Sequence, residues 1–365
     1  MKIHIFNPEH DIALGAGSDR FTAPHAACRL RADLGFLPAL WAEDGDYVLV
    51  DDVETAEIAS RHMGNLMHRV RFVTPNRLAT LSVDDGNTAI LPWGWDMALC
   101  RRLTACNPDL ACFMPDEVVI SHIRMLSNRR FAAEKLLPQL IDGDDRLIGQ
   151  SRYLRDVDEV WQATRGDECV LKAPWSSSGR GIRYVLHDEK HPEESYRTYL
   201  QGWIRNVIRR QGGVMLEPLY RKVKDLGAEF TAGADGKIRF EGLSVFKTVN
   251  GSYTGNVLAS EADKRTMIGR YIDLALLDYN VKHIMQILGP YFKGVYAGPF
   301  GVDMMIVTDE HNGRFLLHPC VELNLRQTMG HAALAVSSQI HDSYRIMNVC
   351  YNGKYRLCIR KTARL

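Results

Sequence analysis

Short apolar runs alternate with helix-like segments along roughly the first 115 residues of this chain. The runs are KIHIF, LPALWA, DYVLV, RVRFV and TAILP, and amphipathic segments such as 22–34 and 95–106 lie between them. Strands that alternate with helices are typical of βαβ units, in which the strands are parallel and buried. The pattern therefore predicts an open parallel α/β lobe over residues 1–120.

The rest of the chain carries a different pattern. Asp116 can cap a helix whose apolar spacing continues to Pro138, and the runs ECVLKAPW, IRYVL and VMLEPLY then read as strands around the amphipathic helix SYRTYLQGWIRNVIRRQ. The dipeptide Asp235-Gly236 lies between alternating runs and predicts a hairpin. A further helix is expected over 265–288. We therefore expect an α/β (α+β) protein with a small lobe over 121–215 and a large lobe over 216–365.

The composition argues against several classes of partner. The 365 residues are 46% hydrophobic and 24% charged, which suits several domains with substantial cores. A net charge of +1 creates no field toward nucleic acid or an anionic membrane, so neither partner is expected. The start, MKIHIFNPEHD, lacks the apolar region of a signal peptide, which predicts a cytoplasmic protein. The eight cysteines show neither CxxC spacing nor a disulfide framework.

The most informative spacing surrounds Asn312-Gly313, a dipeptide that favours two-residue hairpin turns. A turn there would pair Asp303 with Glu322, and strand alternation would put Asn324 and Arg326 on the face of Glu322. Directly opposed carboxylates repel each other unless a cation lies between them, and hard oxygen ligands suit Mg²⁺ or Mn²⁺ bridging phosphates. The alternative is a hydrated sheet face. Pro319 indicates an edge strand or a bulge, which would change the register.

Lys172 ends a predicted strand directly before the sequence SSSGRG. Small residues let backbone N–H groups close over phosphates, and Ser177, Gly179 and Gly181 are the candidates for that contact. The pattern G-x-x-x-x-G-K-[ST] is absent, so the segment is not a P-loop. An ordinary mobile turn is the alternative.

These features together resemble the ATP-grasp superfamily, in which a strand lysine, a glycine-rich lid, a hinge strand and D…E-x-N on a hairpin follow in this order. The resemblance covers about residues 120–335 and extends to D-alanine ligases and carboxylases. It implies ATP and Mg²⁺ or Mn²⁺ as cofactors, and an enzyme that activates a carboxylate as an acyl phosphate for attack by an amine or thiol. An ATP-grasp kinase and a nucleotide-sensing protein without catalysis are the alternatives.

The resemblance also assigns roles to single residues. Asp303, Glu322 and Asn324 become metal ligands, and Lys247 becomes a phosphate contact beside the loop-like NGSYTGN, with a plain surface lysine as the alternative. Arg326 would hold a carboxylate or acyl phosphate, or pair with Glu322. The residues expected to bind the nucleotide are Arg129, Lys172, Ser177, Gly179, Gly181, the adenine-hinge residues Glu217 and Leu219, and Glu229. The family usually has a lysine at the position of Arg129, and either Glu217 or Glu229 can contact the ribose.

A polar cluster, FNPEHDIALGAGSDRFTAPHAA, follows the first predicted strand. Open α/β sheets bind ligands beyond the carboxyl ends of their strands, and the first domain of similar enzymes contributes to the acceptor pocket. We therefore expect Asn7, Glu9, His10, Asp11 and His25 to bind substrate, with a His/Asp metal site or a hydrogen-bonded structural loop as alternatives. The expected partners are a small carboxylate and a small nucleophile, and a homodimer is left open.

Overall fold

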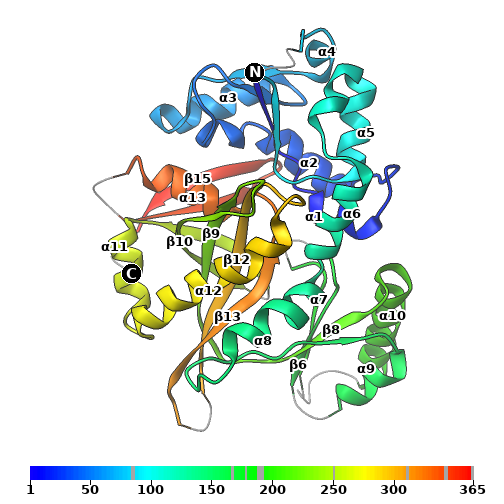
Figure 1. Cartoon of the computed structure of the whole chain (residues 1–365), viewed down its shortest axis with the longest axis vertical. Coiled ribbons are helices and arrows are strands. Elements are labelled where there is room, and N and C mark those ends of the chain that lie inside the picture. The colour runs from blue at the N-terminus through cyan, green and yellow to red at the C-terminus, as the bar shows by residue number, and fades with distance from the viewer. Residues whose placement is uncertain are drawn as a thin grey trace.

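Three sheets organise the chain (Figure 1). The computed structural model describes residues 1–83, 87–165, 168–176, 179–186, 193–249, 251–309, 312–340 and 344–362. A four-stranded sheet comes first in the sequence, a second four-stranded sheet follows, and a seven-stranded sheet uses the remaining strands. The expected fold class, an open parallel α/β lobe followed by two further α/β lobes, is confirmed. The boundaries near 120 and 215 stay a prediction.

The first sheet has the strand order β3-β2-β1-β4, and all its neighbouring strands are parallel. Because β1 lies between β2 and β4, the chain leaves β1 toward one side and later returns on the other, which opens a crevice at the carboxyl ends of β1 and β4. The elements of this part are β1 (Lys2–Ile5), α1 (His10–Ala16), α2 (His25–Leu34), η1 (Leu37–Leu40), β2 (Tyr47–Leu49), α3 (Val53–Met63), η2 (Gly64–Leu66), β3 (Arg71–Val73), α4 (Pro75–Leu78), β4 (Ala89–Pro92), α5 (Met97–Cys106) and η3 (Pro108–Phe113).

The second sheet is antiparallel, with the order β5-β8-β6-β7. The helix expected after Asp116 is broken in its middle, because Asn128 caps a new start by accepting a hydrogen bond from the backbone N–H of Arg130. The elements are α6 (Glu117–Leu126), α7 (Arg129–Phe131), η4, a π-helical turn (Ala132–Leu136), α8 (Leu137–Ile141), β5 (Arg152–Leu154), α9 (Val157–Ala163), β6 (Cys169–Lys172), β7 (Ile182–Val185), α10 (Glu193–Gln211) and β8 (Val214–Pro218).

The third sheet is antiparallel throughout, with the order β13-β12-β9-β10-β11-β14-β15. The hairpin expected across Asp235-Gly236 joins β9 to β10 and is confirmed. The elements are β9 (Lys222–Ala232), β10 (Ile238–Val249), β11 (Ser252–Leu258), α11 (Glu261–Ile268), α12 (Leu274–Phe292), β12 (Gly298–Thr308), β13 (Phe315–Asn324), α13 (Met329–Ser337), β14 (Arg345–Tyr351) and β15 (Tyr355–Lys361).

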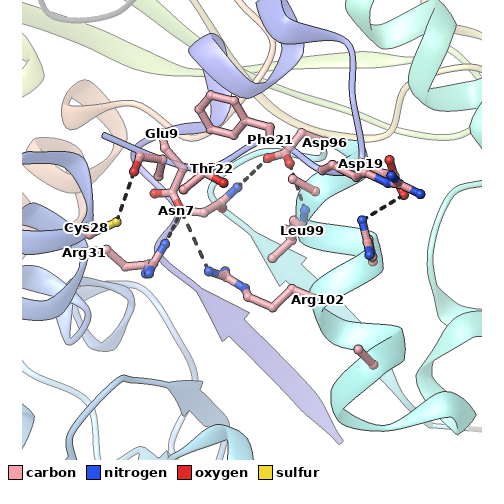
Figure 2. Close-up of a pocket in the computed structure, with 15 residues that line it drawn as sticks. Asn7, Glu9, Asp19, Phe21, Thr22, Cys28, Arg31, Asp96, Leu99 and Arg102 are labelled. Carbon is pink, nitrogen blue, oxygen red and sulfur yellow. Dashed lines mark hydrogen bonds and ion pairs between the residues drawn. The ribbon is translucent and has the colours of Figure 1, made fainter. Parts of the chain in front are cut away.

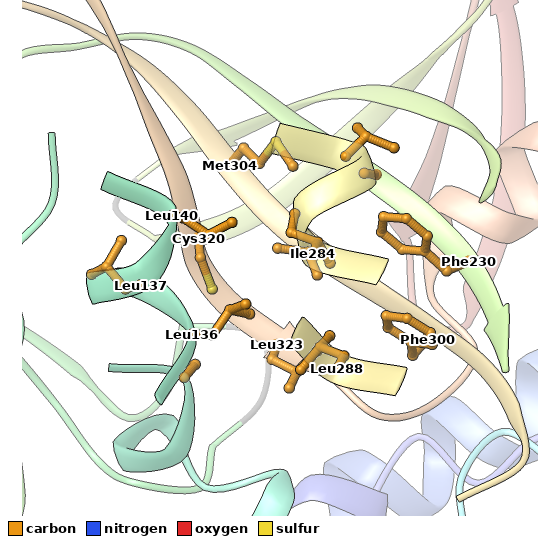
Figure 3. Close-up of a cluster of buried hydrophobic side chains, with 14 of the residues drawn as sticks. Leu136, Leu137, Leu140, Phe230, Ile284, Leu288, Phe300, Met304, Cys320 and Leu323 are labelled. Atoms are coloured by element: carbon orange, nitrogen blue, oxygen red, sulfur yellow. The ribbon is translucent and has the colours of Figure 1, made fainter. Parts of the chain in front are cut away.

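The largest core lies between this sheet and the helices α8 and α12 (Figure 3). The rings of Phe230 on β9 and Phe300 on β12 stack with their centroids 4.9 Å apart, and Ile284 and Leu288 of α12 belong to the same buried cluster. Each such side chain contributes about 1.5–3 kcal/mol by leaving water. Because side chains alternate along a strand, this packing turns the neighbouring residues of β9 and β12 toward the opposite face, where the polar site lies.

Several expectations for local structure are wrong. The run LPALWA forms the 3₁₀ helix η1 instead of a strand. The loop expected over 250–256 is strand β11 from Ser252 onward, and the helix expected over 265–288 is divided into α11 and α12. Strands β14 and β15 were not anticipated. None of the helices in the described residues is both long and apolar enough to span a membrane.

Candidate functional site

A cavity of about 400 Å³ lies where the three lobes meet. Residues of the β1–α1 segment, the helix α7, the segment between β6 and β7, and the strands β9, β10, β12 and β13 all line it. Its charged side chains come from segments more than three hundred residues apart in sequence. They are Asp11, Arg129, Arg180, Glu229, Asp303, Glu322 and Arg326.

The predicted pairing of Asp303 with Glu322 is confirmed, although the turn that predicted it is wrong. Near the turn Thr308 pairs with Phe315, two residues away from the register that an Asn312-Gly313 turn would impose. A register shift between Asp303 and Met305 gives β13 two extra residues and restores the predicted pair. The shift includes Pro319, and β13 is an edge strand, as a proline within a strand indicates.

Asp303 is surrounded by negative charge. Burial, together with the neighbouring carboxylates of Glu322 and Glu229, raises its pKa to about 8. Arg326 and a hydrogen bond with Asn324 oppose this effect and lower the pKa only in part. The same burial and negative charge that raise this pKa would favour a bound cation beside Asp303.

Glu229 lies in a cradle that only glycine permits. A Cβ atom at Gly330 would lie 1.8 Å from Glu229 Oε1, and one at Gly301 would lie 2.6 Å from Oε2. The two oxygens accept hydrogen bonds from Ser244 Oγ at 2.7 Å and Thr328 Oγ1 at 2.8 Å. Gly301 is therefore glycine because the Glu229 carboxylate fills the space that a side chain would need.

Arg129 joins the segment after β6 to the carboxylate hairpin. Its guanidinium donates to the Ala173 carbonyl at 2.6 Å, to Ser176 Oγ at 2.9 Å, and to Glu322 Oε1 at 2.6 Å. The side chain is buried, and its planar fork can reach all three acceptors at once. Lysine has no such fork, which explains why arginine suits this position.

Arg326 pairs with Asp11 and does not pair directly with Glu322. Its Nε lies 3.0 Å from each oxygen of Asp11, and its Nη2 donates to Asn324 Oδ1 at 2.9 Å. Burial alone would lower the pKa of Arg326, but Asp11, with weaker help from Glu322 and Asp303, holds that pKa above its usual value. The predicted carboxylate clamp therefore already holds a carboxylate, which the first lobe supplies.

Lys172 and Glu217 form a buried ion pair of their own. Lys172 Nζ donates to Glu217 Oε2 at 2.5 Å across the neighbouring strands β6 and β8, and Ser151 Oγ donates to Glu217 Oε1 at 3.1 Å. The backbone N–H of Leu219, the expected adenine contact, donates to the Glu168 carbonyl at 3.0 Å. None of these residues is among those that line the cavity.

The glycine-rich segment approaches the turn between β10 and β11. A Cβ atom at Gly179, where φ is +71°, would lie 2.6 Å from the Gly251 carbonyl oxygen, so glycine is required for this close approach. Gly181 permits a similar approach to Ser176. Ser177 lies outside the described residues. Arg180 lines the cavity and was not singled out from the sequence, although its place in the GRG of the predicted lid was a usable signal.

The structure does not bring Lys247 into the cavity. It is exposed on β10, and its neighbours Phe246 and Thr248 line the cavity instead. Strand alternation therefore directs Lys247 to the opposite face of the sheet, which is the surface-lysine alternative.

The polar cluster after β1 is divided between two cavities. Asp11 lines the one described above, whereas Asn7 and Glu9 line a second cavity at the carboxyl ends of β1 and β4 (Figure 2). His10 is buried against the backbone of Gly94 and lines neither cavity. His25 is exposed at the start of α2 and also lines neither. These two histidines are therefore placed as structural and surface residues, respectively.

No model of a protein family matches this chain, and no curated protein sequence matches it. Several solved structures are similar to it. The N5-carboxyaminoimidazole synthetase from Staphylococcus aureus, in complex with ADP, is similar with 14% identity and a TM-score of 0.49, over 96% of this chain and 82% of that chain.

Two further solved structures are similar to this chain. The biotin carboxylase domain of the Hydrogenobacter thermophilus 2-oxoglutarate carboxylase, in complex with MgADP, ADP and bicarbonate, has 16% identity and a TM-score of 0.49, over 95% of this chain and 74% of that chain. A putative ATP-grasp superfamily protein from Archaeoglobus fulgidus has 13% identity and a TM-score of 0.44, over 100% of both chains.

Proposed function

We propose that this chain is an ATP-dependent ligase of the ATP-grasp type, which activates a small carboxylate as an acyl phosphate and transfers it to an amine or similar nucleophile. The observation that carries the proposal is the meeting of Asp303, Glu322, Asn324 and Arg326 in one cavity. Both the spacing of these residues and the resemblance to the ATP-grasp superfamily predicted that they would lie together.

The residues fit a divalent cation that is shared with substrate. Two carboxylates and the amide of Asn324 are hard oxygen ligands, and burial beside the carboxylates of Glu322 and Glu229, which raises the pKa of Asp303, supports a cation at this position. Among the described residues no group of three or more His, Cys, Asp or Glu side chains is arranged to hold a metal by itself. Mg²⁺ or Mn²⁺ held here would take its remaining ligands from nucleotide phosphates and water, as Mg²⁺ commonly does.

Each cation of the site has a role in this proposal. A bound metal ion would neutralise phosphate charge during phosphoryl transfer. Arg129 and Arg180 border the same cavity and would bind phosphate oxygens, while Arg326 would hold the substrate carboxylate with two parallel hydrogen bonds. Since Asp11 is paired with Arg326, the substrate carboxylate would displace Asp11.

The first experiment measures the melting temperature with Mg·ATP, with ATP and a chelator, and with Mg·GTP. Ligand at about one hundred times its dissociation constant stabilises a protein by roughly 2.7 kcal/mol. We expect a shift that requires metal and adenine, and that Asp303→Asn and Glu322→Gln weaken. Glu57→Gln, which removes an exposed carboxylate of α3, is the matched control and should respond like the wild type.

The second measurement is orthophosphate release with paired carboxylates and amines. Release that depends on both compounds supports the ligase, and Glu322→Gln should abolish it without unfolding the protein. Full activity in that variant would contradict the metal site. A stable phosphorylated product formed with a single substrate would overturn ligation in favour of a kinase.

A further inference from the structure

The second cavity contains groups that the proposed reaction does not use. It has a volume of about 590 Å³ and opens at the carboxyl ends of β1 and β4, at the switch point of the parallel sheet. Pockets of this size hold metabolite-sized ligands. Its lining residues and those of the first cavity do not overlap within the described part of the chain. It is therefore a separate compartment.

Two arginines converge on one carboxylate in this cavity (Figure 2). Arg31 of α2 forms an ion pair with Glu9 Oε1, and Nη1 of Arg102 on α5 lies 3.8 Å from the same oxygen. Burial, together with the charge of Arg31, lowers the pKa of Arg102. One carboxylate oxygen thus faces two guanidinium groups. Arg31 has a second acidic neighbour in Asp51, whose Oδ2 lies 3.5 Å from Arg31 Nε, so Arg102 is the more weakly paired of the two cations.

Both sides of this cluster have unused hydrogen-bonding capacity. Glu9 is 6% exposed, and its Oε2 is buried without a hydrogen-bond partner among the described residues. A buried carboxylate oxygen without a donor costs free energy. Arg102 contacts an acid through its long ion pair with Glu9. At that distance the N–H groups of its guanidinium remain available to a ligand in the cavity that Arg102 lines.

The other acids of the cavity are already satisfied. Asp96 Oδ1 caps α5 through the Leu99 N–H at 2.9 Å, and its Oδ2 accepts from Asn7 at 3.2 Å. Asp19 pairs with Arg101 at 3.3 Å. Two groups of the cavity therefore lack full partners: the guanidinium of Arg102, which can bind an anion, and beside it Glu9 Oε2, which requires a hydrogen-bond donor.

We propose that this cavity is a second small-molecule site, which binds a compound carrying an anionic group and, a few bonds away, an amine. The anionic group, a carboxylate or a phosphate, binds Arg102 and Arg31, and the amine donates to Glu9 Oε2. Glu9 directly precedes α1, and Asp11 in the first turn of that helix pairs with Arg326.

The test uses four probes that separate the two halves of this recognition. Acetate and β-alanine share a carboxylate, inorganic phosphate and phosphoethanolamine share a phosphate, and only the second member of each pair has an amine. Isothermal titration calorimetry of the full chain, without nucleotide and at constant ionic strength, gives each dissociation constant. A charge-assisted hydrogen bond predicts that one amine-bearing probe binds about tenfold or more tightly than its amine-free partner. The better pair identifies the anionic group.

Three variants decide the outcome. Arg102→Gln should weaken both members of the better pair, whereas Arg61→Gln, which removes a cation of α3 from the same lobe, should not. Glu9→Gln should abolish the preference for the amine and leave binding of the amine-free anion equal or tighter, a result that misfolding cannot produce. Absence of binding by all four probes would overturn the proposal, as would an amine preference that survives Glu9→Gln. None of these outcomes depends on the ATP site.

Discussion

His318 on β13 is buried with both ring nitrogens unpaired among the described residues. It is 1% exposed, and its ring packs edge-on against Tyr220 with the centroids 5.7 Å apart. Burial, together with the nearby charge of Lys172, lowers its pKa to about 3. His318 is therefore neutral in the folded protein across the physiological range, whereas it takes up a proton near pH 6.5 once the chain unfolds.

This difference in pKa makes stability depend on pH in a defined direction. Between pH 6.5 and 3 the unfolded chain binds one more proton than the folded chain, so stability is present above pH 6.5 and is lost as the pH falls. With a folded pKa of about 3 and an unfolded pKa of 6.5, His318 removes about 2 kcal/mol of unfolding free energy between pH 7 and pH 5. For a chain of this length, that corresponds to about 3 °C in melting temperature.

The variant that tests this is His318→Leu, measured by denaturant unfolding at pH 7 and pH 5. The change in packing is the same at both pH values, so the difference between them isolates the titration. We expect the variant to lose about 2 kcal/mol less than the wild type on acidification. His25→Leu, at an exposed site, should follow the wild type. An identical loss in wild type and His318→Leu would refute the argument that His318 stays neutral because of its burial.

Two substitutions test the construction of the proposed reaction cavity. Arg129→Lys keeps the charge but loses the planar fork. It should cost about 2–4 kcal/mol of unfolding free energy and weaken the Mg·ATP shift, whereas Arg130→Lys, at a half-buried neighbouring site, should change stability by less than about 0.5 kcal/mol. Gly330→Ala should destabilise the protein by about 3 kcal/mol or more because the added Cβ would displace Glu229. Gly202 in α10 has open space around it, so Gly202→Ala should be neutral or stabilising. Equal effects at both glycines would contradict the cradle around Glu229.

The register of the carboxylate hairpin shows what local sequence can and cannot determine. A turn dipeptide and strand alternation predicted Asp303 opposite Glu322, but the pair forms because a two-residue bulge offsets a two-residue difference in register near the turn. The bulge that offsets this difference depends on how β13 packs on β12 and on the core beneath them. The position of Pro319 indicated such a bulge, but its size could not be obtained from the sequence.

The polar partners of the site were beyond the reach of sequence reasoning. Asp11 and Arg326 are 315 residues apart, and Arg129 and Glu322 are 193 apart, so no spacing rule connects them. The motif residues themselves were found because they follow periodic strands. The sequence did not reveal which side of the sheet Lys247 faces, because the core determines which residues of β10 are buried.

These distant pairs determine how the site would respond to ligand under the proposed function. Arg326 is bound to a carboxylate of the first lobe, and Arg129 to a carboxylate of the hairpin, so a phosphate or a substrate carboxylate would exchange one ion pair for another. Such an exchange gains less free energy than a new ion pair, because the charges are already desolvated and compensated. It also releases Asp11 from the large lobe, and that release would alter the contact between the lobes only when substrate is bound. Specificity would then arise because a ligand must compete with Asp11 on geometry as well as on charge.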